Sequence, residues 1–283
     1  MRVGHVVAYL ASAAITHVLA TMSANMGVAK EELFLYAMKS EYYFPVFALT
    51  SRAKTYFALM GAQEGLVFEE PELEMKGAVL KASALPQELR TEAKNMILRT
   101  LNRVAAGEKI NLREEVDYVA NIERGVISDL RTGSTKLFKS IDMKSSDSYK
   151  REPHQSNYMH HMLWESVFAP KYGTAGDPPY VSIRITTSLD KPARLKEWLA
   201  PIEDRELESR ASHFLAGIGR KDLGSMLVPR HITTSIGLPT EIADVVDTRG
   251  VLSQLMEPFY VVLECLGLFF LEGNQQRLLT DYY

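Results

Sequence analysis

The pattern of hydrophobic and polar positions divides the chain into a first part with strand-like segments and a second part with helical spacing. Residues 5–26 are predicted to form one long helix with an apolar face, which ends near Gly27. Aromatic and β-branched residues then predict a small antiparallel meander of strands at 41–50, 53–60, 66–68 and 73–80. Pro45 and Gly77 lie inside these strands, where they indicate an edge, a bulge or a close approach of another backbone.

After Pro86 the pattern becomes helical. Apolar spacing predicts helices at 87–106, 112–132, 157–168, 194–199, 207–218 and 240–247. Residues 179–187 alternate like a further strand, and the helix at 157–168 is expected to stop before Pro170. The sequence therefore predicts an α+β fold with a boundary where strands give way to helices, which gives domains at 1–84 and 85–283.

The segment from Val6 to Met22 carries no formal charge and allows three interpretations. With Arg2 before it, it has the layout of a signal peptide, and it also has the minimum length of a transmembrane span. However, it is rich in Ala, Ser and Thr and contains His17. We expect a buried helix whose small residues pack closely against a sheet, rather than a membrane segment.

Composition and charge exclude several classes of protein. Apolar residues make up 46% of the 283-residue chain, which excludes global disorder. The chain has 32 Lys and Arg against 35 Asp and Glu, a formal net charge of −3, so it is not a globally basic nucleic-acid binder. Cys265 is the single cysteine, which excludes a disulfide framework and a cysteine-based metal site.

No complete catalytic motif is visible in the sequence. It contains no glycine-rich phosphate loop, no G-x-S-x-G elbow and no Asp-x-Asp pair. The last absence matters because phosphoryl transfer by two metal ions needs closely placed carboxylates. His160 and His161 are adjacent on a predicted helix and point about 100° apart, so we expect surface or core histidines rather than metal ligands.

One local segment is basic in an otherwise acidic chain. From Arg131 to Arg151 six Lys and Arg residues face two Asp residues, a local net charge of +4, with Ser, Thr and Tyr149 between them. These side chains can bind phosphate oxygens, which suggests a nucleic-acid contact. The same composition is also typical of an ordinary solvated loop.

The order of short motifs along the first 80 residues carries a family resemblance. A helix is followed by Glu41-Tyr42-Tyr43 on one predicted strand, Lys54-Thr55-Tyr56 on the next and Lys76-Gly77 on the last. This order resembles the distal palm of family B DNA polymerases, in which a catalytic Asp-Thr-Asp motif precedes such a helix. The helical remainder looks like the thumb, and Phe259–Leu263 looks like the tyrosine-bearing helix that closes it. The exonuclease domain, the fingers and both Asp motifs have no counterpart here.

The resemblance implies the C-terminal subunit of a split DNA-directed DNA polymerase of a large bacteriophage, in the cytoplasm of an infected host cell and not in a membrane. It would complete a palm and a mostly helical thumb around primer–template DNA. An N-terminal partner subunit would carry the exonuclease, the fingers and the aspartates that bind Mg²⁺, so the chain alone should be inactive. The alternative is a non-enzymatic phage structural or nucleic-acid-associated protein.

The resemblance also implies roles for particular residues. Lys54 would donate to minor-groove acceptors of the primer duplex, with Tyr56 as its packing neighbour. Lys76 would lie near a backbone phosphate, and Gly77 would allow a close approach to DNA. The thumb would hold duplex phosphates through the basic segment, with Lys136, Lys139, Lys144, Lys150 and Arg151.

Overall fold

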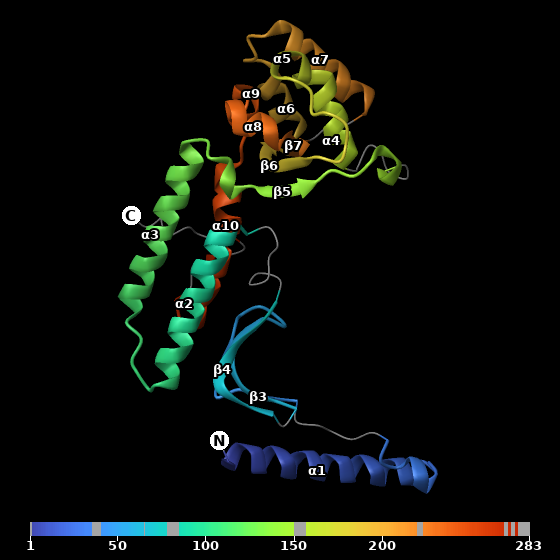
Figure 1. The fold of residues 1–283 in the computed structure, drawn as a ribbon, viewed down its shortest axis with the longest axis vertical. Helices are drawn as coiled ribbons and strands as arrows, with labels where there is room; N and C mark the ends of the chain where they lie inside the picture. Colours follow the sequence, from blue (N-terminus) through green and yellow to red (C-terminus); the bar gives the residue numbers. More distant parts are fainter. Residues whose placement is uncertain are drawn as a thin grey trace. The chain divides into compact units, whose positions relative to one another are not determined.

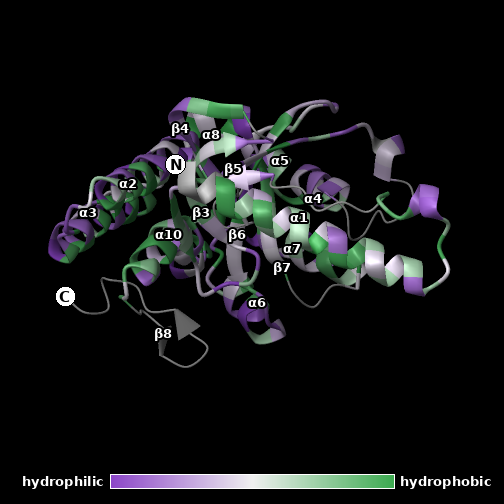
Figure 2. Cartoon of the chain, turned by 90° about the horizontal axis from the view of Figure 1, so that it is seen from below, coloured by the Kyte–Doolittle hydropathy of each residue, from purple (hydrophilic) through white to green (hydrophobic). Residues whose placement is uncertain are grey.

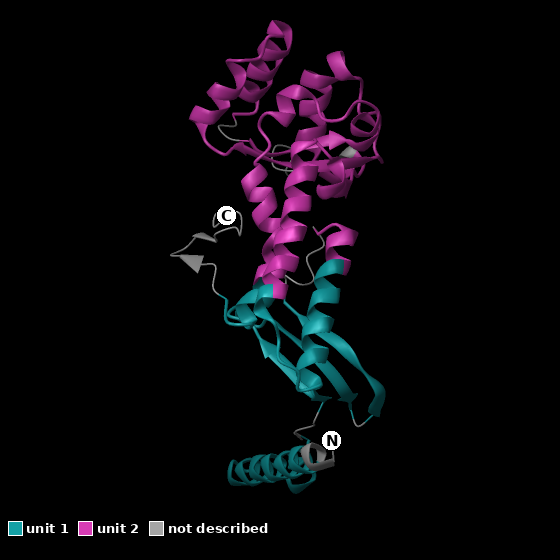
Figure 3. Cartoon of the chain, turned by 90° about the vertical axis from the view of Figure 1, so that its left-hand side faces the viewer, with its two compact units in different colours: residues 1–81, 92–113, 261–269 teal, residues 82–91, 114–260, 270–283 magenta. Residues whose placement is uncertain are grey.

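The computed structural model describes residues 2–35, 41–64, 66–77, 85–149, 157–219, 223–268, 271–272 and 275–276. The chain contains both helices and antiparallel sheets, so the predicted α+β class is confirmed (Figure 1). The chain forms two compact units, coloured separately in Figure 3. Unit 1 consists of residues 1–81, 92–113 and 261–269, and unit 2 of residues 82–91, 114–260 and 270–283. The functional boundary at residues 84 and 85 stays a prediction.

Helix α1 (Arg2–Asn25) confirms the predicted N-terminal helix. Its large apolar residues occur on all sides of the helix axis, and those between Val6 and Met22 are mostly exposed (green and white in Figure 2). Among its described side chains only Ala20 is buried. Among the described residues the expected packing of this helix against a sheet is therefore not seen, and most of its large apolar side chains are exposed. By length and composition Val6–Asn25 would also suffice to cross a membrane.

The sheet of unit 1 is organised around its third strand. Strand β3 (Tyr56–Gln63) pairs antiparallel with β1 (Tyr42–Tyr43), β2 (Val46–Leu49) and β4 (Leu66–Lys76). Strands β1 and β2 lie along one edge of β3, and β4 lies along the other. All side chains from Phe57 to Ala62 are buried, whereas β4 is largely exposed. The acidic residues of β4 therefore lie on a solvated sheet edge.

Pro45 divides the single strand predicted at 41–50 into β1 and β2. Proline has no N–H to donate to β3, so the ladder is interrupted there. Gly61 of β3 accommodates it, because a Cβ at this glycine would lie 3.3 Å from the Pro45 ring. The pairing of β3 with β4 also shifts register between Met60 and Ala62. The irregularity predicted from Pro45 is thus present. The strands predicted at 66–68 and 73–80 form one bulged strand as far as Lys76, and residues 78–80 lie outside the described residues.

Long helices connect the two units. Helix α2 (Gln87–Ala105) and helix α3 (Leu112–Arg131) confirm the predicted helices within one or two residues. Helix α10 (Thr248–Cys265) is longer than the motif at 259–263 indicated, and it continues through Pro258. Within unit 2, the buried Tyr260 hydroxyl of α10 donates a hydrogen bond of 2.7 Å to the buried Glu123 carboxylate of α3.

Unit 2 contains a sheet that the prediction of a mostly helical thumb did not include. Strands β5 (Lys139–Asp142), β6 (Val181–Leu189) and β7 (Leu223–Pro229) pair antiparallel in that order. The surrounding helices are α4 (Asn157–Leu163), α5 (Ala169–Tyr172), α6 (Pro192–Leu199), α7 (Arg205–Gly217), α8 (Arg230–Ile236) and α9 (Thr240–Ala243). Residues 271–272 and 275–276 form the small hairpin β8–β9.

The core of unit 2 lies between this sheet and its helices. Trp164 and Phe168 stack with their ring centroids 5.4 Å apart and pack with Ile183 and Ile185 of β6. These two aromatic residues belong to a π-helical segment, Trp164–Phe168, that joins α4 to α5. The helix therefore does not stop before Pro170. The proline lies in the first turn of α5, where its missing N–H is tolerated.

We expect the replacement Tyr260→Phe to lower the free energy of unfolding by roughly 1–3 kcal/mol. The hydroxyl is a donor to a buried carboxylate, and a buried polar group that loses a donor bears its desolvation cost. Urea denaturation of the full chain measures the change. Tyr9→Phe, at an exposed ring of α1, is the matched control and should leave the midpoint unchanged. A Tyr260→Phe midpoint equal to that of the wild type would contradict this role.

Candidate nucleic-acid interface

Lys54 does not lie on a strand, contrary to the prediction of a strand at 53–60. Strand β3 begins at Tyr56, and Lys54 occupies the turn between β2 and β3 with a left-handed φ of 60°. The turn is closed by the Thr55 carbonyl, which accepts hydrogen bonds from the backbone N–H and the hydroxyl of Thr50. These bonds hold Lys54 in a conformation that L-residues seldom adopt. Its side chain is exposed at the tip of the turn.

Tyr56, Lys76 and Gly77 are brought together at the same end of the sheet. Tyr56 of β3 pairs directly with Lys76 of β4, so both side chains leave the same face. The Tyr56 ring also packs against Phe47 of β2, with centroids 5.0 Å apart. The structure thus joins the second and third motifs of the sequence into one surface, with the exposed Lys54 turn beside it.

Gly77 is required by the fold of this surface. Its φ is +118°, and a Cβ there would lie only 2.5 Å from the Thr55 hydroxyl oxygen. The described atoms closest to this position belong to the side chain of the buried Thr55, and the close approach of DNA that the resemblance implies stays a prediction. This contact fixes the end of β4 against the turn that carries Lys54.

The last residues of helix α10 also support this turn, a feature for which the sequence contains no signal. The Ser51 hydroxyl donates a hydrogen bond of 2.9 Å to the Glu264 carboxylate. The Cys265 thiol donates to the Leu49 carbonyl at 3.3 Å, and burial raises its pKa to about 11, so it stays protonated at neutral pH. Residues more than 200 positions apart thus form one end of unit 1.

The lysines of the basic segment differ in their surroundings. Lys136 lies in the 3₁₀ turn Thr135–Leu137 and forms an ion pair of 2.9 Å with Asp129 of α3. The hydrogen bond between the two side chains raises the pKa of Lys136. Lys139 begins strand β5, and Lys144 follows that strand; both are exposed. Asp129 was not included in the net charge of +4 counted for residues 131–151. Its negative charge therefore compensates part of that positive charge. Lys150 and Arg151 lie outside the described residues.

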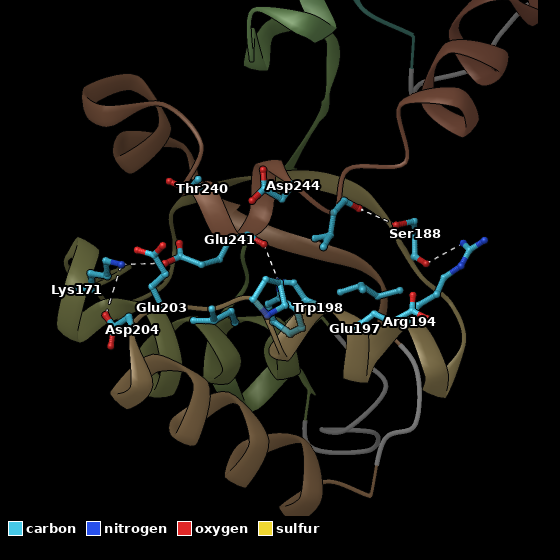
Figure 4. A pocket seen from close by; sticks show the side chains of 14 residues that line it. Lys171, Ser188, Arg194, Glu197, Trp198, Glu203, Asp204, Thr240, Glu241 and Asp244 are labelled. Atoms are coloured by element: carbon cyan, nitrogen blue, oxygen red, sulfur yellow. Dashed lines mark hydrogen bonds and ion pairs between the residues drawn. The ribbon is translucent and has the colours of Figure 1, made fainter.

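A cavity of about 620 Å³ opens in unit 2 between helix α6, the segment 201–204 that follows it, the end of β6 and helix α9 (Figure 4). Its buried floor is apolar and includes Leu189, Trp198 and Ile202. Five carboxylates line it against two cationic side chains, Lys171 and Arg194. An acidic lining of this kind repels phosphate, so the electrostatics of the cavity do not suit DNA binding.

The ion pair at one end of this cavity is a structural network. Lys171 contacts Glu241 at 2.9 Å and Asp204 at 3.5 Å, and the Tyr172 hydroxyl donates to Glu241 at 2.7 Å (Figure 4). Burial opposes ionisation of Glu241, but the hydrogen bonds from Lys171 and Tyr172 outweigh it and lower its pKa. The hydrogen bond to Glu241 raises the pKa of Lys171. Both groups are therefore charged at neutral pH and hold α5 to α9.

The described residues do not provide a site for catalytic metal ions. Within the described ranges no group of three or more His, Cys, Asp or Glu side chains is arranged to hold a cation. His161 instead shares a hydrogen bond of 2.8 Å between its Nδ1 and the Tyr180 hydroxyl. Two-metal nucleotidyl transfer needs closely placed carboxylates, and the described residues do not supply such a group.

Comparison with known families agrees with the resemblance. The model of the family described as Divergent Family B DNA polymerase matches residues 1–283. A search of curated proteins found no match. The chain belongs to the divergent family B DNA polymerases, and its role is related to theirs.

The replacement Gly77→Ala should lower the free energy of unfolding by roughly 2–4 kcal/mol, because it adds a steric clash with Thr55 to the strain of the positive φ. Gly107→Ala is the matched control: its φ is +72°, but a Cβ there would meet no atom within 4 Å. The control should cost only about 1 kcal/mol. Urea denaturation compares the two variants, and equal losses would show that the Thr55 contact has no energetic weight.

Proposed function

We propose that this chain is the C-terminal subunit of a split family B DNA-directed DNA polymerase, which binds primer–template DNA. The single observation that carries the proposal is the family match over residues 1–283 of a sequence without any Asp-x-Asp pair. A partner chain would supply the aspartates that bind Mg²⁺, together with the exonuclease and fingers. We also propose a bacteriophage origin, and hence a place in the cytoplasm of an infected cell.

Helix α1 supports the proposal of a partner. Its exposed apolar side chains, such as Leu10, Val18 and Met22, would be costly in water over so many positions. Burial against another polypeptide gains about 25 cal/mol for each Å² of apolar surface. We therefore propose that the partner chain covers α1 in the assembled enzyme and that the helix does not span a membrane.

Unit 1 would contact the primer end of the DNA in this proposal. A cation at the tip of an exposed turn can reach the minor groove, where every base pair presents acceptors, so Lys54 would hold paired primer ends without reading sequence. Lys76 would bind a backbone phosphate, with Tyr56 and Gly77 shaping the surface beside it. In unit 2, Lys139 and Lys144 would bind duplex phosphates, as would Lys150 and Arg151.

Primer extension tests the proposed function. The purified chain should not extend a primer with Mg²⁺ present, and addition of the polypeptide that co-purifies with it should give template-directed extension. In that complex Lys54→Ala should weaken extension at limiting DNA by the equivalent of roughly 1–3 kcal/mol, the value of a good polar base contact. Lys30→Ala, also exposed and near the end of α1, serves as the control.

Two results would contradict the proposal. Extension by the chain alone that disappears when its own carboxylates are mutated would show that no partner is needed. Extraction of the chain only with detergent would place α1 in a membrane and would remove the argument for a covering protein.

A salt titration tests the basic segment of unit 2. Each phosphate contact contributes a slope of roughly −0.9 to log K against log salt. The double replacement Lys139→Gln and Lys144→Gln should therefore flatten the slope for duplex DNA by about two units. Lys136→Gln should change it much less, because Asp129 already neutralises that lysine. Equal slopes for the wild type and the double variant would remove the segment from the interface.

A further inference from the structure

Four aromatic rings form a continuous row on unit 2. Tyr149 stacks on Tyr158 with centroids 5.9 Å apart and ring planes at 15°. Tyr158 stacks on His161 at 5.3 Å and 27°, and His161 contacts Tyr180 at 5.8 Å. The rings come from the 3₁₀ turn Ser146–Tyr149, from α4 and from the residue before β6.

The two ends of this row differ. At the β6 end, the Tyr180 hydroxyl is engaged by His161, and burial raises the pKa of this tyrosine to about 12. At the other end, Tyr149 is only half-buried, and its hydroxyl accepts a hydrogen bond from the backbone N–H of Lys144. Within the row each inner ring has a neighbour on both sides, whereas Tyr149 has a described ring neighbour on one side. Of the two ends, Tyr149 is thus the one at which the described rings leave an aromatic face without a stacked neighbour.

Two cations lie directly opposite each other on the neighbouring strands β5 and β6. Lys139 of β5 pairs with Arg184 of β6, so both side chains leave the same face of the sheet. Like charges in this position repel each other. The described part of the chain offers neither side chain a carboxylate within ion-pair distance. Arg184 instead donates to two neutral oxygens, Asn157 Oδ1 at 2.7 Å and Ser225 Oγ at 2.9 Å.

Partial burial of the charged Arg184 guanidinium without a carboxylate partner among the described residues carries a desolvation cost. It is half-buried, and this burial lowers its pKa because nothing described nearby compensates its charge. Its bond to Asn157 also connects it to the aromatic row, since Tyr158 is the next residue of α4. An anion bound between Lys139 and Arg184 would relieve both the repulsion and the cost of burial.

We infer that this face of unit 2 binds single-stranded DNA, with a phosphate held between Lys139 and Arg184 and a base stacked on Tyr149. Stacking on aromatic rings next to cations that follow the backbone is how proteins bind single strands without reading sequence. A duplex hides its base faces, so the aromatic row adds nothing to duplex binding. The inference rests on the proposed function only for the identity of the nucleic acid.

The test is direct binding of short labelled strands to the full chain. Fluorescence anisotropy compares a 12-nucleotide oligothymidine with an abasic strand of the same length and with a 12-base-pair duplex. The oligothymidine should bind more tightly than the abasic strand by roughly 5- to 100-fold, the range that one stacked base gives. Tyr149→Leu should remove this difference, and Tyr149→Phe, which keeps the ring, should preserve it.

A second set of variants tests the phosphate contact. Arg184→Gln should flatten the salt dependence of oligothymidine binding by about one unit, and Arg184→Lys should restore most of it. Arg205→Gln, an exposed arginine of α7 that is paired with Glu208, is the matched control and should leave the slope unchanged. Thermal unfolding of each variant confirms that it is folded.

Equal affinity for the abasic and the normal strand would overturn the inference, as would a Tyr149→Leu variant that binds like the wild type. An Arg184→Gln slope equal to that of the wild type would overturn it as well. The assay needs neither metal nor partner, so its failure leaves the primer-extension result unaffected. Conversely, a chain that binds single strands but supports no extension together with its co-purifying polypeptide would retain this site and lose the proposed function.

Discussion

The burial of strand β3 is the constraint on which unit 1 depends. Three strands pair with it, and its side chains from Phe57 to Ala62 are excluded from water. A strand buried in this way fixes its own register, because a slip by one residue would exchange its two faces. The positions of Tyr56 and Lys76 follow from that register. The surface that we propose for the primer contact is thus positioned by the packing of the neighbouring strand residues.

Much of the fold could be predicted from the sequence, since long periodic segments carry strong signals. Helices α1, α2 and α3 agree with their predicted ranges because their length leaves little ambiguity. Strand β7 and helix α8 were not predicted. The segment Leu223–Pro229 contains Gly224 and ends in proline, so its propensity is weak, and pairing with β6 decides its structure. The prediction that the helix stops before Pro170 was wrong because this proline lies in the first turn of α5, where its missing N–H is tolerated.

The candidate sites were predictable only in part. Motifs such as Lys54-Thr55-Tyr56 and Lys76-Gly77 could be found as short strings, and the sheet register shows that two of their residues are neighbours. The same string could not show that Lys54 lies in a turn with a left-handed backbone. The ion pair of Lys136 and the opposition of Lys139 to Arg184 arise from tertiary pairing. Charge counts along a sequence cannot distinguish a paired lysine from one that faces another cation.

The bond between Ser51 and Glu264 has a consequence for how the protein is made. Unit 1 includes residues 261–269, so its contacts are complete only after these residues have left the ribosome, more than 200 positions after Ser51. At roughly 5–20 residues per second, the sheet residues wait some ten seconds or more for the end of α10. During that time strand β4 is an exposed edge, although its carboxylates and Pro71 discourage pairing with other chains. The acidic edge therefore protects a nascent sheet whose last contact is synthesised more than 200 residues after the sheet itself.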